Sequence, residues 1–232
     1  MPLNKKIAVI IQPSFLPWRG YVDLMSRADS IVLLDTVQWV RAHWFNRNLI
    51  DLNKKSHWIT VPVETKGNYV ETIDKINISY QTNWQRKMLT TIKHAYARTE
   101  FFDLYFPKIE KLINQRWTKI SSLSEASLNF YIEAFGLKNT LIRASSLQIE
   151  DEDAVVRLIE ICHALGANKY LSPPAARAYI RNDTRFAEAG IELSWMEYDY
   201  PDYQNDDHGN NKELSAIDLL FKYGPSAGNY IW

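Results

Sequence analysis

The first stretch of this chain that could do chemistry is QPSFLPWRGY, residues 12–21, which directly follows the apolar run 7–11. Gln12 can both donate and accept hydrogen bonds, and the Arg19 guanidinium is a planar fork suited to anions. The two prolines stiffen the turn, and Gly20 allows a close approach to the backbone. The segment therefore predicts a ligand site, although a stiff turn around a packed tryptophan is the alternative. Its candidate binding residues are Gln12, Pro13, Trp18, Arg19, Gly20 and Tyr21.

The second stretch is DTVQWVRAHWFNRN, residues 35–48, and it follows the apolar run 31–34. Asp35 could act as a general base or hold a hydroxyl or amine, and Arg47 could clamp a phosphate or carboxylate. We therefore predict Asp35 and Arg47 as catalytic residues. The alternatives are a plain ion pair between them and, for Arg47, a solvated surface side chain. His43 is a further candidate from this stretch, as is His57 beyond it. The predicted binding residues here are Gln38, Trp44, Asn46 and Asn48.

Two later stretches carry further candidates. In KYLSPPAARAY, residues 169–179, a serine at a strand end and a nearby arginine could hold phosphate, with simple helix capping as the alternative. In YDYPDYQNDDHGN, residues 198–210, polar and aromatic side chains could close over a ligand, or the loop could only be solvated. The binding residues predicted in these stretches are Ser172, Arg177, Tyr203, Gln204 and His208.

The motifs of several common site classes do not occur in the sequence. No Cys and His spacing suggests zinc, so we expect no metal site. Neither GxGxxG, GxxxxGK[ST] nor GxSxG appears, which argues against the standard dinucleotide, P-loop and hydrolase sites.

The elements that must position these residues alternate between strand and helix patterns. The apolar runs 7–11 and 31–34 flank a helical pattern over 18–28, which predicts a βαβ unit and hence a parallel sheet. We therefore predict one α/β domain over residues 1–232, with a Rossmann-like parallel sheet, a helical insertion at about 81–137 and a C-terminal helix. The expected strands are 57–63, 140–143, 169–171 and 191–198, and the expected helices are 84–97, 108–120, 123–135, 151–165, 173–180, 183–189 and 214–223. In such a sheet, ligands bind beyond the carboxyl ends of the strands.

Composition narrows the partners and the compartment. Lys and Arg number 27 and Asp and Glu number 27, so net charge gives no case for binding duplex nucleic acid. The single cysteine, Cys162, excludes an intramolecular disulfide, and its helical apolar surroundings predict a buried thiol. No apolar run approaches about 18 residues, and the first one is too short for a signal peptide. We expect a cytoplasmic protein without a membrane span, whose partner is a small molecule; the oligomeric state is left open.

One long segment, residues 10–50, reads IIQPSFLPWRGYVDLMSRADSIVLLDTVQWVRAHWFNRNLI, and it is followed in order by WITVPV, YLS, YPDYQ and LSAIDLLFKYG. Along nearly the whole chain, these segments resemble the WbqC-like family of bacterial proteins. The resemblance implies a place in O-antigen or related surface-polysaccharide gene clusters and a glycine-type aminoacyl transfer. The sequence departs from the family pattern after YLS, where the glycine-rich run expected of the family is replaced by PPAA.

A second resemblance, at the level of the fold, is to the nucleotidyltransferases with an HxGH turn. The strand, the turn and the helix at residues 7–28 are similar, but Trp18 and Tyr21 stand where that superfamily has its two histidines. Neither aromatic side chain supplies the positive charge that stabilises a transferring phosphate, so nucleotidyl transfer is not expected from this turn. No cofactor is required by any motif, and ATP or another nucleotide is the candidate that the resemblance implies.

The leading hypothesis is a transferase that modifies an amino sugar, in nucleotide-linked form, by acyl or aminoacyl transfer. The second hypothesis is a nucleotide-utilising enzyme with altered nucleotidyltransferase chemistry. The third is a sugar-nucleotide-binding protein without catalysis, and the lack of a recognisable nucleophile and base pair keeps this third hypothesis open.

Overall fold

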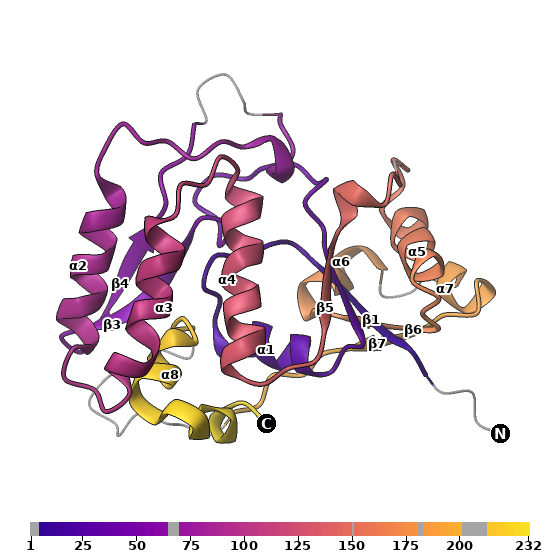
Figure 1. Ribbon diagram of the computed structural model, residues 1–232. Helices are drawn as coiled ribbons and strands as arrows, with labels where there is room; N and C mark the ends of the chain where they lie inside the picture. Colours follow the sequence, from indigo (N-terminus) through magenta and orange to yellow (C-terminus); the bar gives the residue numbers. More distant parts are fainter. Residues whose placement is uncertain (1–4, 65–69, 150, 181–182, 201–212) are drawn as a thin grey trace.

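A five-stranded parallel sheet forms the centre of the computed structural model, which describes residues 5–64, 70–149, 151–180, 183–200 and 213–232 (Figure 1). The order across the sheet is β5-β2-β1-β6-β7. Its strands are β1 (Ile7–Ile11), β2 (Ser30–Leu33), β5 (Thr140–Arg143), β6 (Lys169–Ser172) and β7 (Glu192–Trp195). Counted along the chain, these strands lie in the order 3-2-1-4-5, so the predicted Rossmann-like α/β fold is confirmed. The direction of winding reverses between β1 and β6.

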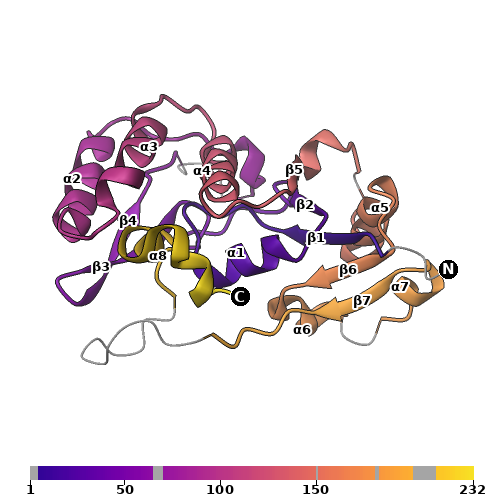
Figure 2. The ribbon, with the colours of Figure 1, turned by 60° about the horizontal axis from the view of Figure 1, so that its bottom comes forward.

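Alternate residues of the strands face opposite sides of the sheet, and each side is covered by helices. Val9 and Ile31 pack against α1 (Arg19–Ser26) and α4 (Ile120–Ala134). Ala8 and Ile10 pack on the other side against α5 (Ala154–Ala164) and Phe186 of α7 (Arg185–Glu188). Figures 1 and 2 both show α5 and α7 on the side of the sheet away from α4.

A second layer of structure lies beyond α4, around an antiparallel hairpin. The hairpin joins β3 (Arg47–Leu52) and β4 (Lys55–Thr60), and the helices α2, α3 and α8 gather beside it (Figure 2). These helices are α2 (Trp84–Tyr96), α3 (Phe102–Asn114) and α8 (Ile217–Tyr223). Among the described residues, no helix has both the length and the apolar character needed to cross a membrane.

The hairpin corrects the sequence prediction for residues 35–63. The strand expected at 57–63 pairs in the hairpin and not in the parallel sheet, and β3 was not predicted because its polar residues indicated a loop. Asn53 and Lys54 form the two-residue turn with φ of 53° and 66°, as a twisted hairpin requires. The usual Asn-Gly signal for such a turn is missing from the sequence, which concealed the hairpin.

Two helix predictions also need correction. The helix expected at 173–180 is a 3-10 turn, η3 (Pro174–Ala176), followed by the single turn α6 (Arg177–Ile180). The helix expected at 108–120 begins earlier, because α3 starts at Phe102 and contains Pro107. By contrast, Gly136 and Gly166 end α4 and α5 with φ of 65° and 62°, as their places in the sequence predicted.

Candidate functional site

A cavity of about 590 Å³ opens beside the carboxyl ends of β1 and β6, where the order of the sheet strands reverses. Open α/β sheets bind ligands at this kind of switch point, and the volume suits a small organic molecule. The described residues that line it are Ile10, Ile11, Gln12, Pro13, Ser14, Trp18, Tyr21, Leu34, His43, Trp44, Phe45, Asn48, Leu158, Tyr170, Pro173, Pro174, Ala175, Ala176, Tyr179, Tyr198 and Glu213.

The walls of this switch-point cavity are mainly apolar, and they include several aromatic side chains. Trp18 and Tyr198 meet edge to face, with ring centroids 4.9 Å apart. Trp44 lies on the hairpin side, where its ring centroid is 5.0 Å from that of Trp58. Among the described lining residues, Glu213 is the one acidic side chain and there is no Lys or Arg. Such walls favour flat rings and sugars over a densely charged ligand.

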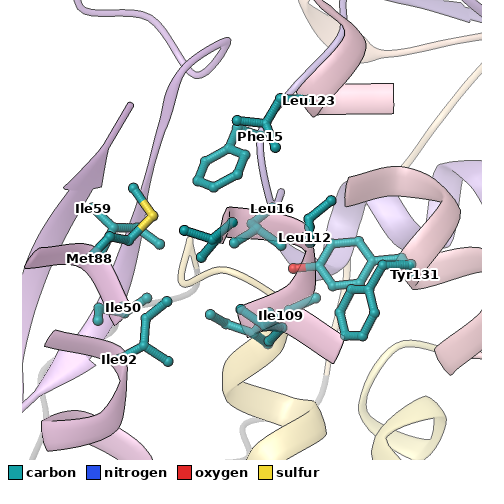
Figure 3. Close-up of a cluster of buried hydrophobic side chains, with 14 of the residues drawn as sticks. Phe15, Leu16, Ile50, Ile59, Met88, Ile92, Ile109, Leu112, Leu123 and Tyr131 are labelled. Atoms are coloured by element: carbon teal, nitrogen blue, oxygen red, sulfur yellow. The ribbon is translucent and has the colours of Figure 1, made fainter. Parts of the chain in front are cut away.

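The turn at residues 12–18 is fixed to the second layer by apolar packing. Phe15 and Leu16 are fully buried, and Figure 3 shows them among side chains of the hairpin and the helices, including Ile50 and Tyr131. Leu16 has φ of 43°, a left-handed conformation that a buried leucine keeps only when its surroundings hold it. The apolar half of QPSFLPWRGY therefore anchors the turn.

Hydrogen bonds hold the same turn from three directions. Asn48 of β3 donates from Nδ2 to the Phe15 carbonyl over 3.2 Å, and Ser14 Oγ donates to the Trp44 carbonyl over 3.0 Å. Tyr131 Oη donates to the Pro17 carbonyl over 3.2 Å. The position of the turn, and so of the cavity wall that it forms, is thus fixed by these hydrogen bonds.

Gly20 does not line the cavity, but it leaves space for the ring of Trp18, which does. A Cβ at Gly20 would lie 2.4 Å from atoms of the Trp18 ring, closer than any real contact. Gly20 therefore makes the room in which the Trp18 indole lies against the start of α1. Tyr21, on the same turn, donates from Oη to the Gln12 carbonyl over 3.0 Å, and burial raises its pKa well above the usual range.

Arg19 lies away from the cavity, with a side chain that is only 2% exposed. Its Nη1 donates to the Tyr230 carbonyl over 3.1 Å, and its guanidinium lies over the Tyr200 ring at 4.8 Å. The guanidinium that the sequence suggested for binding an anion instead joins α1 to the C-terminal segment and to the chain that follows β7.

Asp35 lies at the carboxyl end of β2, and its carboxylate is bound by the chain that follows β5. The Ser145 backbone N–H donates to Oδ1 over 2.9 Å and the Ser145 hydroxyl to Oδ2 over 2.8 Å, both from the 3-10 turn η2 (Ala144–Ser146). Burial raises the pKa of Asp35, and the two bonds from Ser145 lower it in part. Asp35 thus clamps η2 to the end of β2, and its partner is Ser145 and not Arg47.

The other predicted polar residues have contacts of their own. Arg47 lies over the Trp58 ring at 4.1 Å and donates to the Ala42 carbonyl. Asn46 donates from Nδ2 to the Val61 carbonyl over 2.7 Å. Each of these contacts shapes the hairpin and the loop before it.

The segment after β6 differs from the phosphate site that its sequence suggested. Ser172 is fully buried, and its Oγ donates to Tyr170 Oη over 3.3 Å and to the Pro173 carbonyl over 3.3 Å. Pro173, and not Ser172, occupies the N-cap position of η3, and no side chain of the described residues caps this turn. The Arg177 guanidinium lies 5.2 Å from the centroid of the Trp195 ring.

The structure thus divides the predicted residues into three groups. The residues that it brings to the cavity are Gln12, Pro13, Trp18, Tyr21, Trp44, Asn48 and the candidate His43. The residues that it places elsewhere are Arg19, Gly20, Asp35, Gln38, Asn46, Arg47, Ser172 and Arg177. The predictions for Tyr203, Gln204 and His208 fall outside the described residues.

Sequence reasoning missed several lining residues, of which Ser14, Tyr170, Tyr179, Tyr198 and Glu213 carry polar groups. Tyr170 could have been found, because a side chain two positions before the end of a parallel strand lies near the carboxyl edge. Glu213 had no such signal, since it precedes the C-terminal helix and reaches the cavity only through the tertiary fold. Within the described ranges, no group of three or more His, Cys, Asp and Glu side chains could hold a metal ion.

Comparison with known proteins identifies the family. The sequence matches the WbqC-like protein family over residues 12–230. The chain belongs to that family. As a WbqC-like protein it is also similar to the uncharacterized protein Rv1507c of Mycobacterium tuberculosis, with 31% identity over 229 residues that cover 98% of this chain and 97% of the relative. No solved structure matches the chain. The matched range includes every segment that lines the cavity except the end of β1.

Proposed function

We propose that this WbqC-like protein is a transferase that acylates or aminoacylates a nucleotide-linked amino sugar during the synthesis of O-antigen or a related surface glycan. The glycan setting is suggested by membership of the WbqC-like family alone. The main support for the proposal is the cavity at the switch point of the sheet, which is lined by apolar and aromatic side chains and has one acidic residue among its described lining residues.

The chemistry of the walls supports a sugar or a nucleoside as the occupant. Rings such as those of Trp44 and Tyr198 stack on sugar and base faces, while Gln12 and Asn48 can bond to hydroxyl and amide groups. Glu213, an exposed carboxylate at the cavity, is suited to the amine of an amino sugar. No Lys or Arg among the described lining residues could bind the triphosphate of ATP. In the proposal, the rings of the nucleotide-linked sugar therefore lie against these walls, and its phosphates do not.

The catalytic roles predicted for Asp35 and Arg47 stay predictions. In the proposal both residues act by positioning: Asp35 fixes the neighbouring edge of the sheet through Ser145, and Arg47 supports the loop that carries His43. In the proposal, the acyl donor binds at the part of the cavity that Trp44 and His43 line.

Two alanines in one segment give a matched test of the cavity. Ala175 and Ala178 are both exposed, but only Ala175 lines the cavity. We expect Ala175→Phe to weaken binding of a nucleotide-linked amino sugar roughly 100-fold, or about 2.7 kcal/mol, because the phenyl ring occupies the space of the ligand. Ala178→Phe should bind like the wild type. Isothermal titration of the wild type and both variants measures the difference, with circular dichroism to confirm that each is folded.

Other outcomes would change the proposal. Equal affinity of the two variants would place the ligand outside the cavity. Binding of nucleoside triphosphates alone, with release of pyrophosphate, would favour the nucleotidyltransferase-like alternative. Tight binding of the amino-sugar nucleotide without a mass gain from any thioester or aminoacyl-adenylate donor would favour the binding-protein alternative.

A further inference from the structure

His43 reaches the cavity from a loop whose backbone is held in an unusual conformation. The residue before it, Ala42, has φ of 58°, in the left-handed region that alanine seldom adopts. Arg47 donates to the Ala42 carbonyl and so fixes this conformation, and the His43 ring packs on Phe45 with the centroids 4.3 Å apart. Strained backbone that presents one side chain to a cavity is typical of functional sites.

The two ring nitrogens of His43 have different surroundings. Nδ1 is buried and has no hydrogen-bond partner among the described residues. Nε2 is not buried without a partner in this way. Because His43 lines the cavity, Nε2 is the ring nitrogen that can form a hydrogen bond with a ligand there. A proton on Nδ1 would be a buried N–H donor without an acceptor, which costs free energy. The proton of the neutral ring therefore belongs on Nε2, and Nδ1 keeps its lone pair.

The ring is also held in its neutral form. An imidazolium would carry an N–H at both nitrogens, and the one at Nδ1 would be left buried and unpaired. Burial lowers the pKa of His43, and the positive charge of Arg47 lowers it further. A neutral ring with its proton on Nε2 can donate a hydrogen bond into the cavity, but it cannot accept a proton there.

We infer that His43 is a catalytic hydrogen-bond donor, through Nε2–H, to the carbonyl oxygen of the acyl donor, and not a general base. This inference rests on the proposed function. In the step, the amine nitrogen of the sugar forms a bond to the carbonyl carbon, and the bond from that carbon to the thiolate or nucleotide leaving group breaks. The proton of the amine departs with the leaving group. Negative charge that develops on the carbonyl oxygen is stabilised by the Nε2–H of His43, which keeps its proton throughout.

The tautomer of His43 can be measured without any ligand. In ¹⁵N-labelled protein at pH 7, long-range ¹⁵N–¹H correlation spectra should show a protonated Nε2 and an unprotonated Nδ1, assigned by the loss of these signals in His43→Gln. A proton on Nδ1, or on both nitrogens, would overturn the inference. This result stands independently of the proposed function, because it needs neither substrate nor turnover.

Two amide variants then separate a donor from a base. The amide nitrogen of glutamine reaches the place of Nε2, whereas that of asparagine reaches only the place of Nδ1. We expect kcat for acyl transfer to fall less than about tenfold in His43→Gln and about 100-fold or more in His43→Asn, with KM little changed in either. An equal loss in both variants would indicate a base and contradict the inference. If the wild type shows no acyl transfer, the proposed function fails and the NMR result still decides the state of His43.

Discussion

The two halves of the carboxyl edge of the sheet use strand-end polar residues in different ways. At β1 and β6 the following segments diverge and leave a cavity, which Gln12 and Tyr170 line. At β2 and β5 the following segments converge, and Asp35 binds Ser145 over 2.8 and 2.9 Å. In this sheet, the polar residue after a strand that lines a cavity is therefore Gln12, at the point where the winding reverses. Elsewhere along the edge, the same kind of residue ties two connections together.

The largest effect expected from this comparison is a loss of stability at the β2–β5 edge. Asp35→Ala removes the acceptor of two hydrogen bonds and leaves the Ser145 N–H without a partner. We expect unfolding free energy to fall by about 3 kcal/mol, and Tm by about 6–12 °C. Affinity for the nucleotide-linked amino sugar should be unchanged in protein that is still folded. Calorimetry and titration measure the two quantities.

The matched variant for this prediction is Asp35→Asn. Its amide oxygen can accept from the Ser145 N–H, and its amide nitrogen can donate to the Ser145 hydroxyl, so most of the stability should return. A stable Asp35→Asn protein that binds ligand but has no turnover would instead support the catalytic role predicted for Asp35, and the comparison of the two edges would then be wrong.

A smaller loss of unfolding free energy, together with weaker ligand binding, is expected from a change beside β1. In Gly20→Ala the new Cβ would overlap the Trp18 ring at 2.4 Å, so the indole must move. We expect a loss of about 2 kcal/mol in unfolding free energy, with weaker ligand binding because Trp18 lines the cavity.

The double variant Gly20→Ala with Trp18→Phe sharpens this prediction. Phenylalanine lacks the outer indole atoms that the Cβ would contact. The double variant should therefore lose about 1 kcal/mol less unfolding free energy than the two single variants lose together. Additive effects, measured by urea unfolding, would show that Gly20 has some role other than making room for Trp18.

The smallest expected effect is the pH dependence that His43 brings to stability. Its pKa is lower in the folded protein than the value of about 6.5 in an unfolded chain, so the unfolded state binds more protons between these two values. The contribution of His43 is thus complete above about pH 6.5 and is lost as the pH falls through the folded pKa. Between pH 7.5 and 5, the wild type should lose more stability than His43→Gln in urea unfolding, and parallel losses would contradict the lowered pKa.

Much of the fold was predictable because its signals are local. The apolar runs of β1 and β2, the four-residue spacing of Trp84, Met88 and Ile92 in α2, and the glycines after α4 and α5 each act within one element. The hairpin was not predictable in this way. Asn48 and Ile50 of β3 are buried only in the folded protein, by the turn at residues 12–18 and by distant helices. This burial leaves no local signal, and the polar sequence of β3 indicated a loop.

The candidate site was predictable at its first strand and less so elsewhere. The turn after β1 lies at the switch point, and its place follows from the βαβ pattern alone. Whether Asp35 and Ser172 face a ligand depends on Ser145, 110 residues along the chain, and on the Tyr170 hydroxyl beside Ser172. These tertiary partners give each residue a contact that the sequence did not predict, and no spacing in the sequence identifies them.

A crystal structure of the protein with a nucleotide-linked amino sugar would show whether the ligand binds at the switch point between β1 and β6. We expect electron density for the ligand rings between Trp44 and Tyr198, with Gln12 within hydrogen-bonding distance and the bonds between Asp35 and Ser145 intact. Ligand density at the β2–β5 edge, with Ser145 displaced from Asp35, would contradict this expectation.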